Sequence, residues 1–199
     1  MASVLAGFKP VKHLSGAAWN GQVNRYTCPA GDAASAINIG DLVILSDVDS
    51  GTKYPSIERA TGTTAVVPVG VVVGFEPDYS NLNTGSFRAV STLRTALVAD
   101  ATDLVFSAPQ DAVGGVIATA SLGLNVALVA GSAATTAPYA SAMTLDSSDV
   151  ATTNTYPFRI VGFTDAPDND ETSTSRPAEV LVRINTHRNG DGPGVAGVA

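Results

Sequence analysis

Few side chains in this 199-residue sequence could carry out acid–base, nucleophilic or metal chemistry. The chain has two histidines, His13 and His187, and a single cysteine, Cys28. Nucleophilic catalysis needs a histidine beside a serine or cysteine, with a third group that orients the ring. These residues are far apart in the sequence and lie in no motif of that kind. We therefore predict that the protein is not an enzyme and that it has no catalytic residues.

Carboxylates cluster in two stretches, the first with Asp47 and Asp49 and the second with Asp165, Asp168, Asp170 and Glu171. Calcium prefers oxygen-rich loops, but neither stretch has the twelve-residue spacing of an EF-hand. Paired carboxylates also hydrolyse glycosides, but aromatic platforms for a sugar are scarce here. No glycine-rich loop is followed by the Lys-Ser/Thr pair that binds phosphate. We predict solvated turns, with no metal and no cofactor.

The charge balance argues against nucleic acid as a partner. Only 15% of the residues are charged and the net charge is −7, so the chain repels a phosphate backbone at long range. The N-terminus lacks the charged and apolar regions of a signal peptide. The most apolar stretch, residues 65–75, is too short for a transmembrane helix and contains Pro68, Gly70 and Gly74. We expect no membrane partner.

Short valine-rich segments separated by turns dominate the pattern. Side chains that branch at Cβ favour the pleated backbone. Strands are predicted at residues 41–45, 65–75, 87–99, 124–130, 157–164 and 179–186. One short helix is predicted over residues 109–120, because Ser107 and Gln110 resemble a capping box. The predicted fold is all-β, a β-barrel or β-sandwich with at most one short helix.

A weak internal repeat runs through these strands. Residues 72–75 (Val-Val-Gly-Phe) reappear as residues 160–163 (Ile-Val-Gly-Phe), an offset of 88 that also matches Arg88 to Arg176 and Leu93 to Leu181. A second match, between Ile39-Gly40 and Leu122-Gly123, has an offset of 83. The repeat indicates either a duplicated β-unit or simply a common way for strands to end.

We divide the chain into an N-terminal arm (1–31), a β-rich body (32–188) and a flexible C-terminal tail (189–199), with two possible units in the body at about 32–106 and 107–188. Glycine and proline interrupt the arm, which also carries aromatic and basic residues. We interpret it as a segment that docks onto a neighbour through Phe8, Lys9, Lys12 and Trp19. Alternatively, the arm wraps its own barrel and Trp19 plugs one end. The glycine-rich tail cannot bury enough surface to offset its ordering entropy.

Residues 112–145 contain no charged side chain. This stretch is either a buried strand pair with a loop of small residues, or a weakly hydrated surface that meets another subunit, because interface cores are depleted in charge.

Several segments resemble small structural proteins of tailed-bacteriophage heads over about residues 4–188, namely Gly-Phe-Lys-Pro-Val-Lys-His-Leu (7–14), Trp-Asn-Gly (19–21), Val-Gly-Phe-Glu-Pro-Asp (73–78), Val-Gly-Gly (113–115) and Val-Leu-Val-Arg-Ile-Asn-Thr-His (180–187). The resemblance implies a capsid decoration, or cement, protein with a small β-barrel, β-tulip or jelly-roll fold. Such a protein binds the major capsid protein on the outside of the virion, as a homodimer or homotrimer, after assembly in the host cytoplasm.

The main alternative is a receptor- or glycan-binding β-module of a phage head or tail fibre, which would present aromatic side chains in exposed loops. A major capsid protein would need a long helix and a longer chain, and a hydrolase would need more titratable groups. A decoration protein needs only a rigid body and a contact surface, and its oligomerisation raises avidity.

Overall fold

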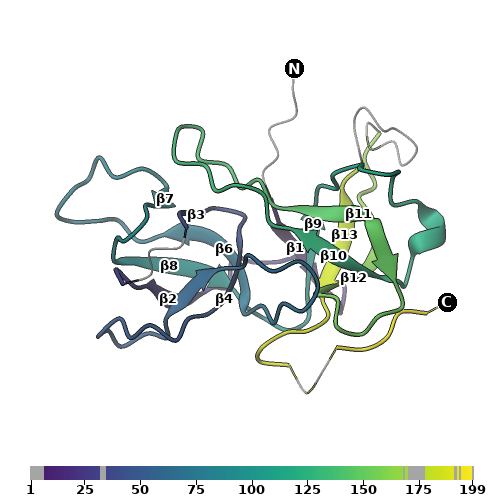
Figure 1. The fold of residues 1–199 in the computed structure, drawn as a ribbon, viewed down its shortest axis with the longest axis horizontal. Helices are drawn as coiled ribbons and strands as arrows, with labels where there is room; N and C mark the ends of the chain where they lie inside the picture. Colours follow the sequence, from purple (N-terminus) through teal and green to yellow (C-terminus); the bar gives the residue numbers. More distant parts are fainter. Residues whose placement is uncertain are drawn as a thin grey trace.

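The computed structural model describes residues 7–31, 35–167, 169, 178–190, 192 and 194–198. The all-β prediction is confirmed, since strands make up 38% of the residues that the structure describes and helix only 2%. The sheets pack in a sandwich-like arrangement and do not form a closed barrel. Figure 1 shows the five-stranded sheet on the left and the six-stranded sheet on the right.

The five-stranded sheet consists, in spatial order, of β2 (Asn24–Cys28), β8 (Arg94–Ala99), β6 (Gly70–Phe75), β4 (Leu42–Leu45) and β5 (Ile57–Arg59). The six-stranded sheet consists of β1 (Lys9–His13), β9 (Leu104–Ala108), β13 (Val180–Ile184), β12 (Phe158–Phe163), β10 (Asn125–Val129) and β11 (Thr144–Ala151). A small third sheet pairs β3 (Ile37–Asn38) with β7 (Phe87–Arg88). All of the strand pairs within these sheets are antiparallel.

The two large sheets share one strand order. If the strands of the set β2-β8-β6-β4-β5 are numbered from one to five by their order in the sequence, their spatial order is 1-5-4-2-3. The set β9-β13-β12-β10-β11 has the same spatial order, 1-5-4-2-3. In each set a parallel bridge also links the first strand, or the residues just after it, to the region of the third: Thr27 to Ser56, and Gln110 to Leu145. The six-stranded sheet therefore repeats the five-stranded one and adds β1 at its edge.

The repeat extends to the register of the strands. The β6–β8 ladder shifts between Val72 and Gly74, and the β12–β13 ladder shifts at the corresponding place, between Ile160 and Gly162. A bulge of this kind bends the strand and increases its twist. The two bulges are 160 − 72 = 88 residues apart, which is the first offset of the sequence repeat.

The second offset corresponds to a pair of turns before β4 and β10. The Gly40 amide donates to the carbonyl of Val72 at 2.7 Å, and the Gly123 amide donates to that of Ile160 at 3.0 Å. These two glycines, 123 − 40 = 83 residues apart, have φ values of 91° and 84°. Glycine adopts positive φ without steric cost, so both turns need it.

One match of the predicted repeat is wrong, and another is not tested. Leu181 is paired with Gly162 in the way that Leu97 is paired with Gly74, so the counterpart of Leu181 is Leu97 and not Leu93. Arg176, the predicted match of Arg88, lies outside the described residues. The predicted boundary between residues 106 and 107 cuts through β9, which belongs as a whole to the six-stranded sheet.

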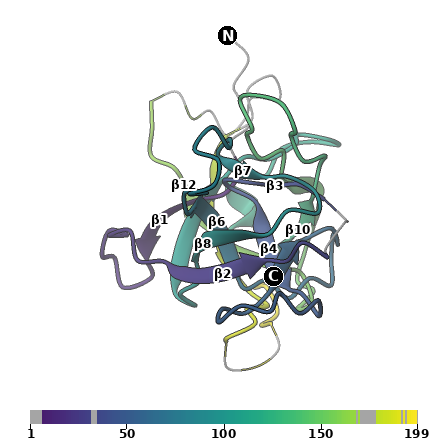
Figure 2. The same cartoon turned by 90° about the vertical axis from the view of Figure 1, so that its left-hand side faces the viewer.

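The described part of the predicted arm, residues 7–31, is built into the body. β1 pairs with β9 and β2 pairs with β8, so these segments supply an edge strand to each large sheet. Figure 2 shows β2 crossing the front of the five-stranded sheet. Of the glycines and prolines that suggested an irregular arm, only Pro10 lies within a strand, and the others precede β1, lie between β1 and β2, or follow β2. The strands form because their backbone groups find ladder partners that a free arm would lack.

The helix predicted over residues 109–120 is also wrong. Only residues 119–121 are helical, as a single 3₁₀ turn. The Gln110 side chain accepts a hydrogen bond from the Ile117 amide and donates to the Ala178 carbonyl, so it anchors a loop. Ser107 lies in β9, where its hydroxyl donates to Glu179 at 2.5 Å and so does not act as a helix cap.

Two hydrophobic cores result. The larger core is shared between the sheets and includes Leu42, Val71 and Ala99 from the first and Phe106, Leu128 and Phe158 from the second. The smaller core lies on the other face of the five-stranded sheet and includes Tyr26, Cys28, Val43, Ile57, Val72 and Val98. Because one core draws on both sheets, the two halves support each other.

The C-terminal segment predicted as a flexible tail makes specific contacts with the body. The amides of Gly197 and Val198 donate to the carbonyls of Thr152 and Gly123, each at 3.0 Å. The carbonyl of Val195 accepts hydrogen bonds at 2.8 Å from the side chains of Asn125 and Arg159. Residues 194–198 therefore lie against the start of β10.

Candidate protein-binding surface

Phe8, one of the four predicted contact residues, belongs to the core. Its side chain is 1% exposed, and its ring stacks on Phe158 with the centroids 4.6 Å apart. The Phe8 amide donates to the carbonyl of Gly40 at 2.9 Å. Phe8 therefore fastens the start of β1 to both sheets and does not present its ring to a partner.

The other three predicted contact residues reach the surface. Lys9 and Lys12 are exposed on β1, and the Lys9 ammonium lies 3.5 Å from the Glu179 carboxylate. Trp19 is partly buried against the shared core, and its indole N–H donates to the carbonyl of Gln22 at 3.3 Å. A partly buried tryptophan held in one orientation is typical of residues that anchor protein interfaces.

An apolar groove of about 450 Å³ brings Phe8, Lys9 and Trp19 together, whereas Lys12 is not among its lining residues. Its other walls come from four distant segments and include Ile39, Val73, Ser86 and Tyr139. Ile39 is 38% exposed, which leaves apolar surface available to a partner. This groove is the candidate functional site.

One wall of the groove is the loop between β10 and β11, which contributes Pro138, Tyr139 and Ala140. The Tyr139 ring stacks on Phe87, with centroids 4.4 Å apart and an angle of 7° between the planes. This loop, green in Figure 1, reaches across toward β3. There Asn38 exchanges two hydrogen bonds with the backbone of Ala134, at 2.9 and 3.0 Å.

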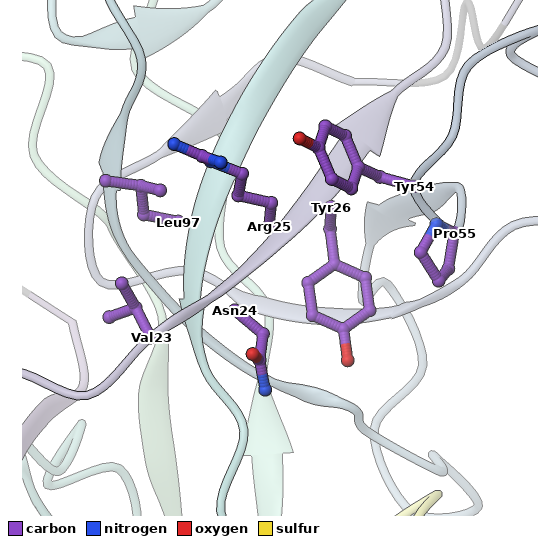
Figure 3. Close-up of a pocket in the computed structure, with 7 residues that line it drawn as sticks. All are labelled: Val23, Asn24, Arg25, Tyr26, Tyr54, Pro55 and Leu97. Carbon is purple, nitrogen blue, oxygen red and sulfur yellow. The ribbon is translucent and has the colours of Figure 1, made fainter.

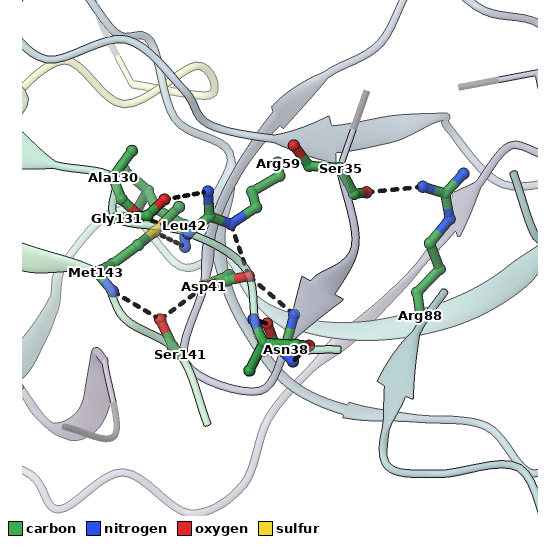
Figure 4. A network of polar contacts seen from close by, with 11 residues as sticks. Ser35, Asn38, Asp41, Leu42, Arg59, Arg88, Ala130, Gly131, Ser141 and Met143 are labelled. Atoms are coloured by element: carbon green, nitrogen blue, oxygen red, sulfur yellow. Dashed lines mark hydrogen bonds and ion pairs between the residues drawn. The ribbon is translucent and has the colours of Figure 1, made fainter. Parts of the chain in front are cut away.

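A buried ionic network holds the same loop to the five-stranded sheet (Figure 4). The Asp41 carboxylate accepts hydrogen bonds from Arg59 Nε at 3.0 Å, from the Ser141 hydroxyl at 2.6 Å and from the Asn38 amide at 2.8 Å. Burial raises the pKa of Asp41, while Arg59 and the hydrogen bonds act in the opposite direction. Arg59 also donates to the carbonyls of Ala130 and Gly131.

Further contacts in Figure 4 complete this region. The Leu42 amide donates to the sulfur of Met143 at 3.0 Å, and the Met143 amide donates to the Ser141 hydroxyl at 3.2 Å. The fully buried Arg88 donates to the Ser35 carbonyl at 3.0 Å and so secures β7, which precedes β8. The groove is thus framed by fixed segments.

The histidines serve local structure. His13 Nδ1 lies 3.1 Å from both oxygens of Asp103, a pairing that orients an imidazole. Cys28, with 0% exposure, is enclosed in the smaller core, away from solvent. His187 is buried, and that burial lowers its pKa, opposed by Asp100. Its Nδ1 accepts a hydrogen bond from the Asn189 amide at 3.0 Å.

The predicted carboxylate clusters are only partly described. Asp49 accepts a hydrogen bond from the Gly51 amide at 2.8 Å, as expected of a turn. Asp168, Asp170 and Glu171 lie outside the described residues. Within the part of the chain that is described, no three metal-ligating side chains gather. No helix of that part is long and apolar enough to cross a bilayer.

No protein-family model, curated protein or solved structure matches this chain. The similarity to phage head proteins therefore rests on the sequence motifs alone.

The sequence predicted Phe8, Lys9 and Trp19 of the groove as contact residues but did not predict the residues of its other walls. Nothing in the local pattern marked Ile39 or Val73 as surface residues, because Val73 lies in the apolar strand predicted at residues 65–75 and Ile39 directly precedes the strand predicted at residues 41–45. Tyr139 falls in the charge-free stretch at residues 112–145. The sequence of that stretch indicates either a buried strand pair or a surface that meets another subunit.

Proposed function

We propose that this protein is a structural component of a phage head, a decoration protein that attaches to the outside of the capsid and stabilises contacts between capsomers. The observation that carries the proposal is the apolar groove beside β1, which combines the anchoring side chain of Trp19 with exposed Ile39. The motifs at residues 7–14 and 19–21 that resemble phage head proteins include β1 and Trp19 themselves.

The distribution of charge also supports attachment through the face that carries β1 and the groove. The whole chain has a net charge of −7, whereas Lys9 and Lys12 are exposed on β1 beside the groove. A local positive patch on an acidic protein steers this face toward an acidic partner and turns the rest of the molecule away from packaged DNA.

The framing of the groove suits a cementing role. Binding to a preformed surface does not incur the entropy cost of ordering loops, so more of the contact energy appears as affinity. The shared core and the Asp41–Arg59 network hold the groove walls before any partner arrives. Attachment at many lattice points would then resist the separation of capsomers.

The experiment that tests this proposal is binding of the purified protein to bare capsid shells. Saturable binding at fixed lattice points is expected. Trp19→Ala should weaken it roughly tenfold or more, because buried tryptophans dominate interface energies. Lys12→Glu should weaken it through charge, and Lys53→Glu, which makes the same change on an exposed loop outside the groove, serves as the control. Failure of the folded wild-type protein to bind any shell overturns the proposal.

One observation favours the alternative of a glycan- or receptor-binding module. The loop between β6 and β7 exposes Tyr79 at 88% and Leu82 at 79%, and an exposed aromatic ring can stack on a sugar. The turn that carries them is ordered by Asp78, which accepts hydrogen bonds from the amide and hydroxyl of Ser80. A selective hit on a glycan array that Tyr79→Ala abolishes would support this alternative over the decoration role.

A further inference from the structure

The strand β2 has an open edge. It pairs with β8 on one side. On the other side, within the described part of the chain, only the amide of Thr27, near the end of β2, is bonded, to the Pro55 carbonyl at 2.9 Å. Backbone groups alternate in direction along an antiparallel strand, so Arg25 also directs its N–H and C=O away from β8. Among the residues that the structure describes, no strand pairs with this edge at residues 22–25.

The repeated strand order identifies what such an edge accepts. Arg25 is opposite Leu97 on β8, just as Ser107 on β9 is opposite Leu181 on β13. Residues 104–107 are therefore the counterparts of residues 22–25. On β9 this edge is covered by β1, which pairs Lys9 with Ser107 in antiparallel register.

The covered edge of β9 and the uncovered edge of β2 differ in how far their residues are buried. Residues 104–107 are all buried beneath or beside β1, whereas Gln22, Asn24 and Arg25 are exposed. An uncovered strand edge presents unpaired backbone groups and is a ready template for another chain.

Two hollows flank the open edge. The first, of about 580 Å³, is shown in Figure 3 and is lined by Val23, Arg25, Tyr54, Pro55 and Leu97. In that view Arg25 and Tyr54 lie on one side of the strand while Asn24 and Tyr26 point to the other. The apolar part of this lining, formed by Val23, Pro55 and Leu97, offers a place for alternate side chains of an added strand.

The second hollow, of about 630 Å³, is polar and acidic. Its lining includes Asn24, Asp100 and Asp103. The Asp103 carboxylate is about half exposed and already pairs with His13, a residue of β1. An added strand would therefore meet an apolar wall on one face and carboxylates on the other, which suits apolar residues that alternate with basic ones.

We propose that residues 22–25 form a strand-addition site that binds an extended segment of a partner protein, with alternating apolar and basic side chains, antiparallel to β2. Main-chain hydrogen bonds supply the affinity and the two hollows supply the selectivity. The β1 strand, with the sequence Lys-Pro-Val-Lys-His, occupies the corresponding edge of β9 and combines basic and apolar side chains, although without strict alternation. The site is separate from the groove, and the inference does not depend on the capsid role.

A partner of a different kind from this chain is favoured over a second copy. In a second copy, β1 is already paired with its own β9. The carboxylates of Asp100 and Asp103 in the second hollow favour a partner segment with basic side chains, whereas this chain is acidic overall.

The test uses an acetylated, amidated peptide, Gly-Phe-Lys-Pro-Val-Lys-His-Leu, with a scrambled peptide of the same composition as its control, and measures binding to the full-length protein by calorimetry. Saturable binding of the first peptide alone is expected. Arg25→Pro removes the outward N–H and should weaken binding roughly tenfold or more, because proline cannot donate to a ladder. Arg25→Ala keeps that N–H and removes only the side chain that lines the first hollow, so it measures the side-chain contribution, and Arg25→Pro should weaken binding well beyond it.

Hydrogen exchange on the wild-type protein provides a measurement that does not depend on the folding of the proline variant. Bound peptide should protect the Arg25 amide, while the Asn24 and Tyr26 amides, which face β8, should change little. Equal binding of the scrambled peptide, no binding, or no new protection at Arg25 overturns the inference. Self-association of the protein that Arg25→Pro abolishes would also overturn it, by identifying a second copy as the occupant.

Discussion

At the residue scale, side chains that suggested contact or chemistry prove to have structural contacts. The Phe8 ring is in the core, the Cys28 thiol is enclosed, and His13 is paired with Asp103. The sequence could not distinguish these roles, because an aromatic or titratable residue has the same local signal whether it faces a partner, a core or a neighbouring carboxylate. Trp19 differs from Phe8, since its side chain is only partly buried against the core and also lines the groove.

The pH dependence of stability is predicted at this scale, from His187. Burial lowers its pKa in the folded state below the unfolded value of about 6.5. Its contribution to stability is therefore fully present above pH 6.5 and is lost as the pH falls through the lower folded-state value, because the unfolded chain binds the proton first. The free energy of unfolding in urea should drop between pH 7.5 and pH 5.

His187→Gln should reduce that drop, while His13→Gln, which removes a histidine outside this buried position, should leave the contribution of His187 in place. An equal loss of stability on acidification in wild type and His187→Gln would contradict the assignment.

At the element scale, the sequence located most strands but not their partners. The predicted segments 41–45, 124–130, 157–164 and 179–186 contain β4, β10, β12 and β13. Two errors have a common cause. The arm at residues 7–31 and the helix at residues 109–120 were judged from local breakers and caps, whereas strand pairing and the Gln110 hydrogen bonds involve residues far away in the chain.

Deletion of residues 194–199 is predicted to destabilise the protein, which replaces the sequence-based expectation of an idle tail. The deletion removes the Val195 carbonyl that accepts a hydrogen bond from Asn125, a side chain with 0% exposure. Loss of a partner for a buried polar group costs about 1–3 kcal/mol. Thermal and urea unfolding should show that loss.

Val195→Ala is the matched control, because it keeps the carbonyl and removes only a side chain that is 56% exposed. An unchanged melting temperature in the deletion variant would mean that these contacts contribute nothing in solution.

At the scale of the whole molecule, two sheets of the same strand order are joined by one core and by one ionic network. The network links Asp41 and Arg59 of the first sheet to the loop between β10 and β11 of the second. Because that loop also forms a wall of the groove, the coupling of the two halves and the shape of the candidate site depend on the same residues.

Asp41→Ala is predicted to lower the free energy of unfolding by about 3–5 kcal/mol, because it leaves the buried Arg59 guanidinium without its charge partner. The double variant Asp41→Ala/Arg59→Met should lose less than the sum of the two single variants, since the second change removes the unpaired charge. Chemical denaturation of all four proteins measures the coupling. Additive losses would show that the two residues act independently.

The sequence by itself determined the all-β class and the offsets of 88 and 83 that mark the repeat. Both are consequences of local patterns, namely β-branched runs, the Gly74 and Gly162 bulges and the turns at Gly40 and Gly123. Only the tertiary structure decided that β1 covers β9 while the edge of β2 stays open, and that Trp19, Ile39 and Tyr139 share one groove. Those outcomes depend on which distant strands pack together, and a local pattern does not encode the identity of a distant partner.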